Sequence, residues 1–114
     1  MVIENAKITD AELSMEDHGC LVLFLTLKGR TWTVLYGGRV IGKGYVGAEE
    51  FTGYAKGIEE VMRIMDTVGV SKFTDMVGKY VRVDLGSWGD SVTKIGNIIE
   101  DKWFDYKEFY RADS

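Results

Sequence analysis

The chain has 114 residues, which is enough for one hydrophobic core but not for two, so residues 1–114 are predicted to form a single domain. Its formal charge of −4 argues against a protein that functions mainly by binding nucleic-acid phosphates, and we expect no stable nucleic-acid partner. A lone cysteine, Cys20, excludes an internal disulfide and is typical of a reducing compartment.

Membrane insertion is not expected. The longest apolar run, residues 21–27, is far too short to cross a bilayer, and the chain opens without the pattern of a signal peptide. We therefore expect a soluble, cytoplasmic protein with no membrane partner.

The N-terminal third predicts three antiparallel strands in a meander, because apolar and polar side chains alternate there between short turn-forming segments. The first strand is long and imperfectly alternating, so we expect a bulge near Ala6. Trp32 and Tyr36 share one face of the third strand. The three predicted strands cover residues 2–15, 20–28 and 31–36.

A glycine-rich segment and the main helix follow. Residues 37–57 contain seven of the 14 glycines, more than the interior of a strand or helix tolerates well, so this stretch is predicted to be irregular. Residues 58–68 place apolar side chains at helical spacing and are followed by Gly69, which predicts a helix that ends there.

The C-terminal third predicts two strands, residues 80–85 and 92–99, and a short aromatic-rich helix, residues 101–111. The expected fold class is therefore α+β, with an antiparallel β-sheet on which one main helix and a short C-terminal helix are packed.

Groups suited to catalysis or metal binding are scarce. His18 and Cys20 are too few for a zinc site and are more simply a solvated turn histidine and a small core cysteine. The acidic pair Glu59-Glu60 is adjacent rather than opposed across a cleft, so it is expected to be solvated. We predict no catalytic residue, no metal and no cofactor, and hence a binding protein rather than an enzyme.

The first predicted ligand-binding group lies in and before the glycine-rich segment. It combines the aromatic rings of Trp32 and Tyr36 with the cations Arg39 and Lys43. Rings stack on a flat base, and cations and glycine amides bind phosphate, so these residue types suit a nucleotide-like ligand. The alternative, that the glycines serve turns and the aromatic rings serve the core, stays open.

A second predicted group lies near the end of the sheet. It combines Trp88 with the polar side chains of Thr93, Lys94 and Asn97, and Arg111 at the end of the C-terminal helix is positioned to join it. The alternative is structural, with Trp88 capping the core and Arg111 neutralising the helix end.

Several segments resemble a family of small phage and prophage proteins, and the likeness covers nearly the whole chain. That family is taken to include the phage anti-Thoeris sponges, which bind cyclic ADP-ribose signals made by bacterial TIR-domain enzymes. The segments are Ile3-Glu4-Asn5-Ala6-Lys7-Ile8-Thr9, Gly42-Lys43-Gly44-Tyr45, Gly47-Ala48, Gly57-Ile58-Glu59-Glu60-Val61-Met62, Gly78-Lys79-Tyr80-Val81-Arg82-Val83, Lys94-Ile95-Gly96-Asn97-Ile98-Ile99 and Trp103-Phe104.

The resemblance implies a homo-oligomeric protein of the host cytoplasm that holds a cyclic ADP-ribose-type nucleotide without cleaving it and so blocks TIR-based immunity. No ligand-contact motif can be aligned residue by residue, so the two groups above rest on their chemistry. Two other functions stay open. One is an OB-like module for single-stranded nucleic acid, and the other is a phage protein that inhibits a host enzyme.

Overall fold

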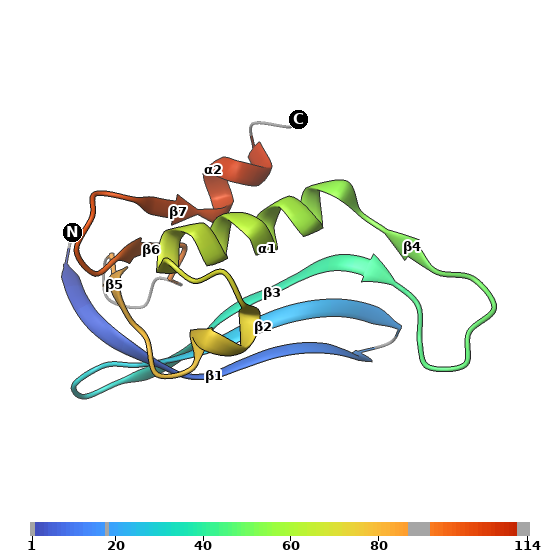
Figure 1. Cartoon of the computed structure of the whole chain (residues 1–114), viewed down its shortest axis with the longest axis horizontal. Helices are drawn as coiled ribbons and strands as arrows, with labels where there is room; N and C mark the ends of the chain where they lie inside the picture. The colour runs from blue at the N-terminus through green and yellow to red at the C-terminus, as the bar shows by residue number, and fades with distance from the viewer. Residues whose placement is uncertain (1, 18, 87–91, 112–114) are drawn as a thin grey trace.

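The computed structural model describes residues 2–17, 19–86 and 92–111. In this part of the chain an antiparallel sheet of seven strands carries one main helix and a short C-terminal helix, which confirms the predicted α+β class. Figure 1 shows α1 lying along one face of the long, curved strands β1, β2 and β3. The sheet has the order β4-β3-β2-β1-β5-β6-β7. The elements are β1 (Ile3–Asp17), β2 (Cys20–Lys28), β3 (Thr33–Lys43), β4 (Thr52–Gly53), α1 (Ala55–Val68), the 3-10 helix η1 (Phe73–Met76), β5 (Tyr80–Asp84), β6 (Lys94–Asn97), β7 (Trp103–Asp105) and α2 (Tyr106–Arg111).

The bulge in β1 lies two to three residues beyond the predicted position. Ala6 pairs regularly with Val81 of β5, whereas the pairing with β2 shifts between Ile8 and Asp10. The extra residue, Thr9, changes which side chains face the core, so that both Ile8 and Ala11 point toward it. The predicted position near Ala6 was therefore wrong. The bulge lies after Lys7, the last residue of β1 that pairs with β5, and the alternation of side chains changes only there.

The third strand is longer than predicted. It runs through Gly37 and Gly38 to Lys43, and both glycines adopt positive φ angles, 125° and 91°, where the pairing with β2 is irregular. A Cβ at Gly37 would lie 2.0 Å from the carbonyl oxygen of Leu23, so only glycine fits. These glycines form a bulge inside a strand, and the predicted irregular segment begins only after Lys43.

The main helix begins three residues earlier than predicted, at Ala55, and ends as predicted. Gly69 adopts the left-handed conformation and its N–H donates to the carbonyl of Met65, a common way for a helix to end. Inside the helix, Gly57 faces Ile41 of β3 so closely that an added Cβ would lie 2.6 Å from the Ile41 Cα. Gly57 therefore allows the helix to approach the sheet closely, and it does not belong to the irregular segment before the helix.

Part of the predicted C-terminal helix is a strand. Residues 103–105 pair with β6 as β7, and only Tyr106–Arg111 is helical. Asp105 marks the change, because its Oδ1 accepts the N–H groups of Lys107 and Glu108 and so caps the helix. The strand predicted over residues 92–99 is shortened to β6, since a turn begins at Asn97.

The hydrophobic core lies between the sheet and α1 (Figure 1). None of the helices in the described ranges is long and apolar enough to span a membrane. The fully buried core side chains include Ile8, Leu25, Leu27, Tyr36, Ile41, Ile64, Met76, Val81, Val83 and Ile95.

Candidate functional site

Three of the predicted ligand-binding residues come together, and they do so across the two predicted groups. The hydroxyl of buried Tyr36 on β3 donates to the carbonyl of Thr93 at 3.0 Å, just before β6. The guanidinium carbon of Arg39 lies 5.3 Å from the centre of the Tyr36 ring. This side-chain hydrogen bond joins residues 57 positions apart in the chain, which spacing alone did not predict.

Arg39 is already paired within the protein. Its Nε donates to Oε2 of Glu60 at 3.0 Å, and a second guanidinium nitrogen contacts the same oxygen. Glu60 is only 2% exposed and Arg39 only 18% exposed, so this is a largely buried ion pair. The guanidinium also lies 3.7 Å from the ring centre of Tyr106 on α2. An incoming anion would have to compete with Glu60 for this cation.

Glu60 connects three elements of the fold. It lies on α1, it binds Arg39 of β3, and its Oε1 accepts the hydroxyl of Tyr110 on α2. Burial first, and then the hydrogen bond to Glu60, raise the pKa of the Tyr110 hydroxyl well above its usual range. Burial likewise raises the pKa of Tyr36. The interpretation of Glu60 as a solvated carboxylate was wrong, and its spacing from buried Gly57 and Ile64 was the available signal.

The remaining residues of the first predicted group lie apart from this network. The indole N–H of Trp32 donates to Glu4 at 3.1 Å, so the ring is held against the first strand. Lys43 is exposed at the far end of β3, beside Thr52 of β4. The structure therefore does not bring Trp32, Arg39 and Lys43 to one pocket.

The second predicted group is also dispersed. Lys94 lies 4.9 Å from the ring centre of Trp103, and Arg111 is the last residue of α2. Trp88 lies outside the described residues, as does His18. Asn97 is buried, and its side chain donates to the carbonyl of Thr67 at 2.9 Å near the end of α1.

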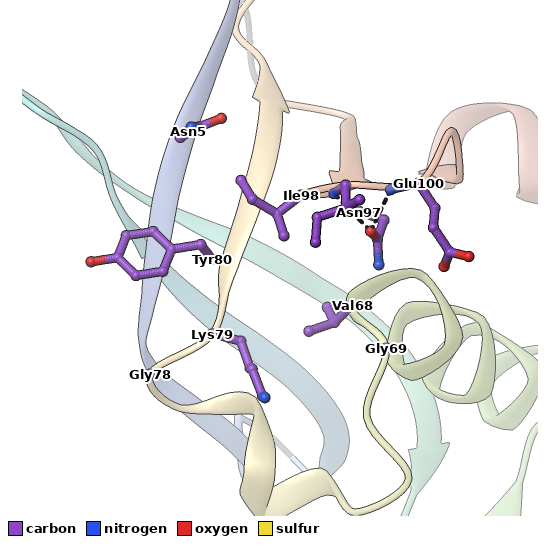
Figure 2. A pocket seen from close by; sticks show the side chains of 10 residues that line it. Asn5, Val68, Gly69, Gly78, Lys79, Tyr80, Asn97, Ile98 and Glu100 are labelled. Carbon is purple, nitrogen blue, oxygen red and sulfur yellow. Dashed lines mark hydrogen bonds between the residues drawn. The ribbon is translucent and has the colours of Figure 1, made fainter.

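Asn97 also borders an open cleft of about 800 Å³. The cleft lies between the end of α1, the start of β5 and the turn after β6, and Figure 2 shows these three walls. The side chains of Val68 and Lys79 point into the space between the walls, whereas the ring of Tyr80 points away from it (Figure 2). The cleft is lined by Asn5, Val68, Gly69, Gly78, Lys79, Tyr80, Asn97, Ile98, Ile99 and Glu100.

A second hollow of about 430 Å³ adjoins the cleft and shares Gly69 and Lys79 with it. Its other lining residues include the hydroxyl-bearing Ser71 and Thr74 and the carboxylate of Asp75. Lys79 thus lies at the border of two adjoining hollows. Lys79 was not predicted as a ligand contact from the sequence. Its only local signal is its position between a glycine, Gly78, and the start of the predicted strand at residue 80.

The chemistry of the cleft is that of a binding site for a polar molecule with an apolar part. A lysine and hydroxyls suit phosphate or ribose, while Val68 and Ile98 offer apolar contact. Among the described residues, no three or more His, Cys, Asp and Glu side chains form a group that could hold a metal ion. Comparison of the chain with protein-family models, curated proteins and solved structures finds no match.

Proposed function

We propose that this protein binds a cyclic ADP-ribose-type nucleotide, holds it without cleaving it, and so acts as a phage sponge against TIR-based immunity in the host cytoplasm. The observation that carries the proposal is the position of Lys79 between two adjoining hollows. Their volumes lie within or near the range of roughly 300–1,000 Å³ that is usual for small-molecule sites.

The lining supports a ligand with a charged centre and two less polar ends. A diphosphate next to the Lys79 ammonium gains charge-assisted hydrogen bonds. On one side, Val68 and Ile98 give apolar contact for a base, and on the other, Ser71 and Thr74 give hydroxyls for ribose or phosphate oxygens. This order of groups corresponds to a diphosphate that links two nucleoside parts.

The resemblance to the sponge family adds the biological role, and sequestration requires only tight, slowly released binding. The test is calorimetry with purified protein and each cyclic ADP-ribose isomer, followed by heat denaturation and identification of the released compound. Recovery of the intact isomer after tight binding supports a sponge. Recovery of a cleaved product would show an enzyme, and no heat of binding with any isomer would refute the proposal.

Lys79→Gln is expected to weaken binding of the cyclic nucleotide by about 10- to 100-fold, because a charged hydrogen bond contributes about 1.5–3 kcal/mol. Calorimetry measures the change. The matched control is Lys72→Gln, since Lys72 is also exposed and near η1 but lines neither hollow. Equal affinity of Lys79→Gln and the unmodified protein would place the ligand elsewhere.

We also propose that copies of the chain assemble through the outer edge of β3. Residues 33–40 pair with β2 on one side, and in the described part of the chain no strand pairs with their other side, since β4 reaches only Gly42 and Lys43. Leu35 on this edge is 66% exposed. An unpaired strand edge with an apolar side chain is a template for pairing with a second copy.

Leu35→Lys is expected to weaken this assembly by at least about tenfold, because a charge on an edge strand opposes strand addition. Size-exclusion chromatography with light scattering, over a range of protein concentrations, measures the mass. Met62→Lys is the control, since Met62 is 64% exposed but lies on α1 and not on a strand edge. A monomeric unmodified protein, or an unchanged mass for Leu35→Lys, would contradict this interface.

A further inference from the structure

The face of the sheet turned away from α1 carries a cluster of aromatic and basic side chains, which we call the outer face cluster. Ala6 and Ile8 of β1 and Val81 and Val83 of β5 are all fully buried on the core side. Because side chains alternate along a strand, the residues between them point to the opposite face. With their cross-strand neighbours on β6 and β7, these residues form the cluster Lys7, Tyr80, Arg82, Lys94 and Trp103.

Trp103 lies flat in this cluster. It pairs with Gly96 across the strands, and a Cβ at Gly96 would lie 2.6–2.8 Å from three atoms of the indole. Only glycine leaves room for a ring in this position. The indole N–H donates to Asp101 at 3.1 Å, which fixes the orientation of the ring. A ring held in this way is a platform on which a base can stack with little loss of side-chain freedom.

Two cations lie over the ring. The guanidinium carbon of Arg82 lies 4.6 Å and the ammonium of Lys94 lies 4.9 Å from the centre of Trp103. Arg82 is held in place, because it donates to the carbonyls of Asn97 at 2.7 Å and Glu100 at 2.8 Å. Lys7 lies opposite Tyr80 in the register of β1 and β5. Cations thus alternate with rings across the face.

Two of the carboxylates near this cluster accept backbone N–H groups, and a third, Asp101, accepts the indole N–H of Trp103. Asp84 accepts the N–H of Gly86 at 2.9 Å, and Asp105 caps α2 through the N–H of Lys107. Hydrogen bonding leaves these carboxylates charged, and Asp84 and Asp105 are the cross-strand neighbours of Lys94. The cluster therefore attracts phosphate through the local positions of Lys7, Arg82 and Lys94 and not through a net positive charge. The expectation of no nucleic-acid partner rested on the total charge of −4, which does not describe where the individual cations lie on this face.

We propose that the outer face cluster binds a short segment of single-stranded nucleic acid. Bases stack on the rings of Trp103 and Tyr80, and the phosphates between them lie near Arg82, Lys94 and Lys7. Stacking on aromatic rings with cations along the backbone is the usual way in which a sheet surface binds single strands without strict sequence preference. The cluster borders the Lys79 cleft, because Tyr80 also lines that cleft, but the Tyr80 ring points away from it (Figure 2).

The test is fluorescence anisotropy with a labelled eight-nucleotide oligothymidine at several salt concentrations. With three cations at the phosphates, log K is expected to fall with log salt with a slope of about −2. Trp103→Ala is expected to weaken binding by about tenfold, which is within the effect of losing one stacked base. Lys94→Gln is expected to reduce the slope by about 0.7 and keeps the ring in place.

The control is Tyr45→Ala, because Tyr45 is 60% exposed but lies outside the cluster. Thermal melting shows whether each variant is folded. If Trp103→Ala is unfolded, the test relies on Lys94→Gln alone. Oligonucleotide binding that falls in Trp103→Ala but not in Lys79→Gln supports the proposal, whatever the cyclic nucleotide does. Undetectable binding at low salt or an unchanged salt slope in Lys94→Gln would overturn it. So would a loss of oligonucleotide binding in Tyr45→Ala but not in Trp103→Ala.

Discussion

Replacing Glu60 with alanine is expected to lower the free energy of unfolding by about 3–5 kcal/mol, which is the usual effect of removing one partner of a buried ion pair. The Arg39 guanidinium would stay in a largely buried position without its carboxylate, and the Tyr110 hydroxyl would lose its acceptor. Because Glu60 joins α1 to both β3 and α2, the C-terminal helix should loosen as well. Urea unfolding followed by circular dichroism measures the loss.

The neighbouring residue provides a matched control. Glu59 pairs with Arg63 one helical turn away, with exposed fractions of 45% and 58%, so Glu59→Ala should cost only about 0.3–0.5 kcal/mol. Removing the cation first should also reduce the effect, and Glu60→Ala should cost clearly less in an Arg39→Met background. If the two glutamate variants have equal stability, Glu60 is not the buried partner that the structure shows.

Gly57→Ala is expected to lower the free energy of unfolding by about 1–3 kcal/mol, the range of overpacked core substitutions. The new methyl group would lie 2.6 Å from the Cα and 2.5 Å from the Cβ of Ile41, and a strand backbone cannot move aside as a side-chain end can. Alanine is otherwise favoured over glycine inside a helix by up to about 1 kcal/mol, so the sign of the result separates the two effects.

Gly53→Ala is the control for this prediction, because nothing lies within 4 Å of a Cβ at Gly53 and its φ is not positive. It should change stability by less than about 0.5 kcal/mol. A rise in Tm for Gly57→Ala would mean that α1 can move away from β3 and that helix propensity dominates at this position.

The residues that were grouped from the sequence and the residues that the fold brings together overlap only in part. Arg39 and Tyr36, which were grouped from the sequence, lie close together in the structure, but Arg39 is bound by Glu60, which lies 21 residues away and had been interpreted as solvated. Lys79 and Trp103 were not proposed as ligand contacts. Their setting depends on Asn97, Gly69 and Gly96, which come from other elements, so no local pattern marks them.

Local chemistry was enough for the features that depend on a few neighbouring residues. The apolar run of β2 and the glycine that ends α1 were predicted correctly, since strand alternation and the left-handed cap act within about one turn of chain. Tertiary contacts determined the rest. Gly37 and Gly38 form a bulge because Leu23 approaches from β2. Residues 103–105 form a strand because β6 offers a free edge. Glu60 is buried because β3 and α2 bring Arg39 and Tyr110 to it. These partners lie tens of residues away, where propensity and spacing carry no information, and the free energy of burying and pairing them exceeds the small local preferences of the chain.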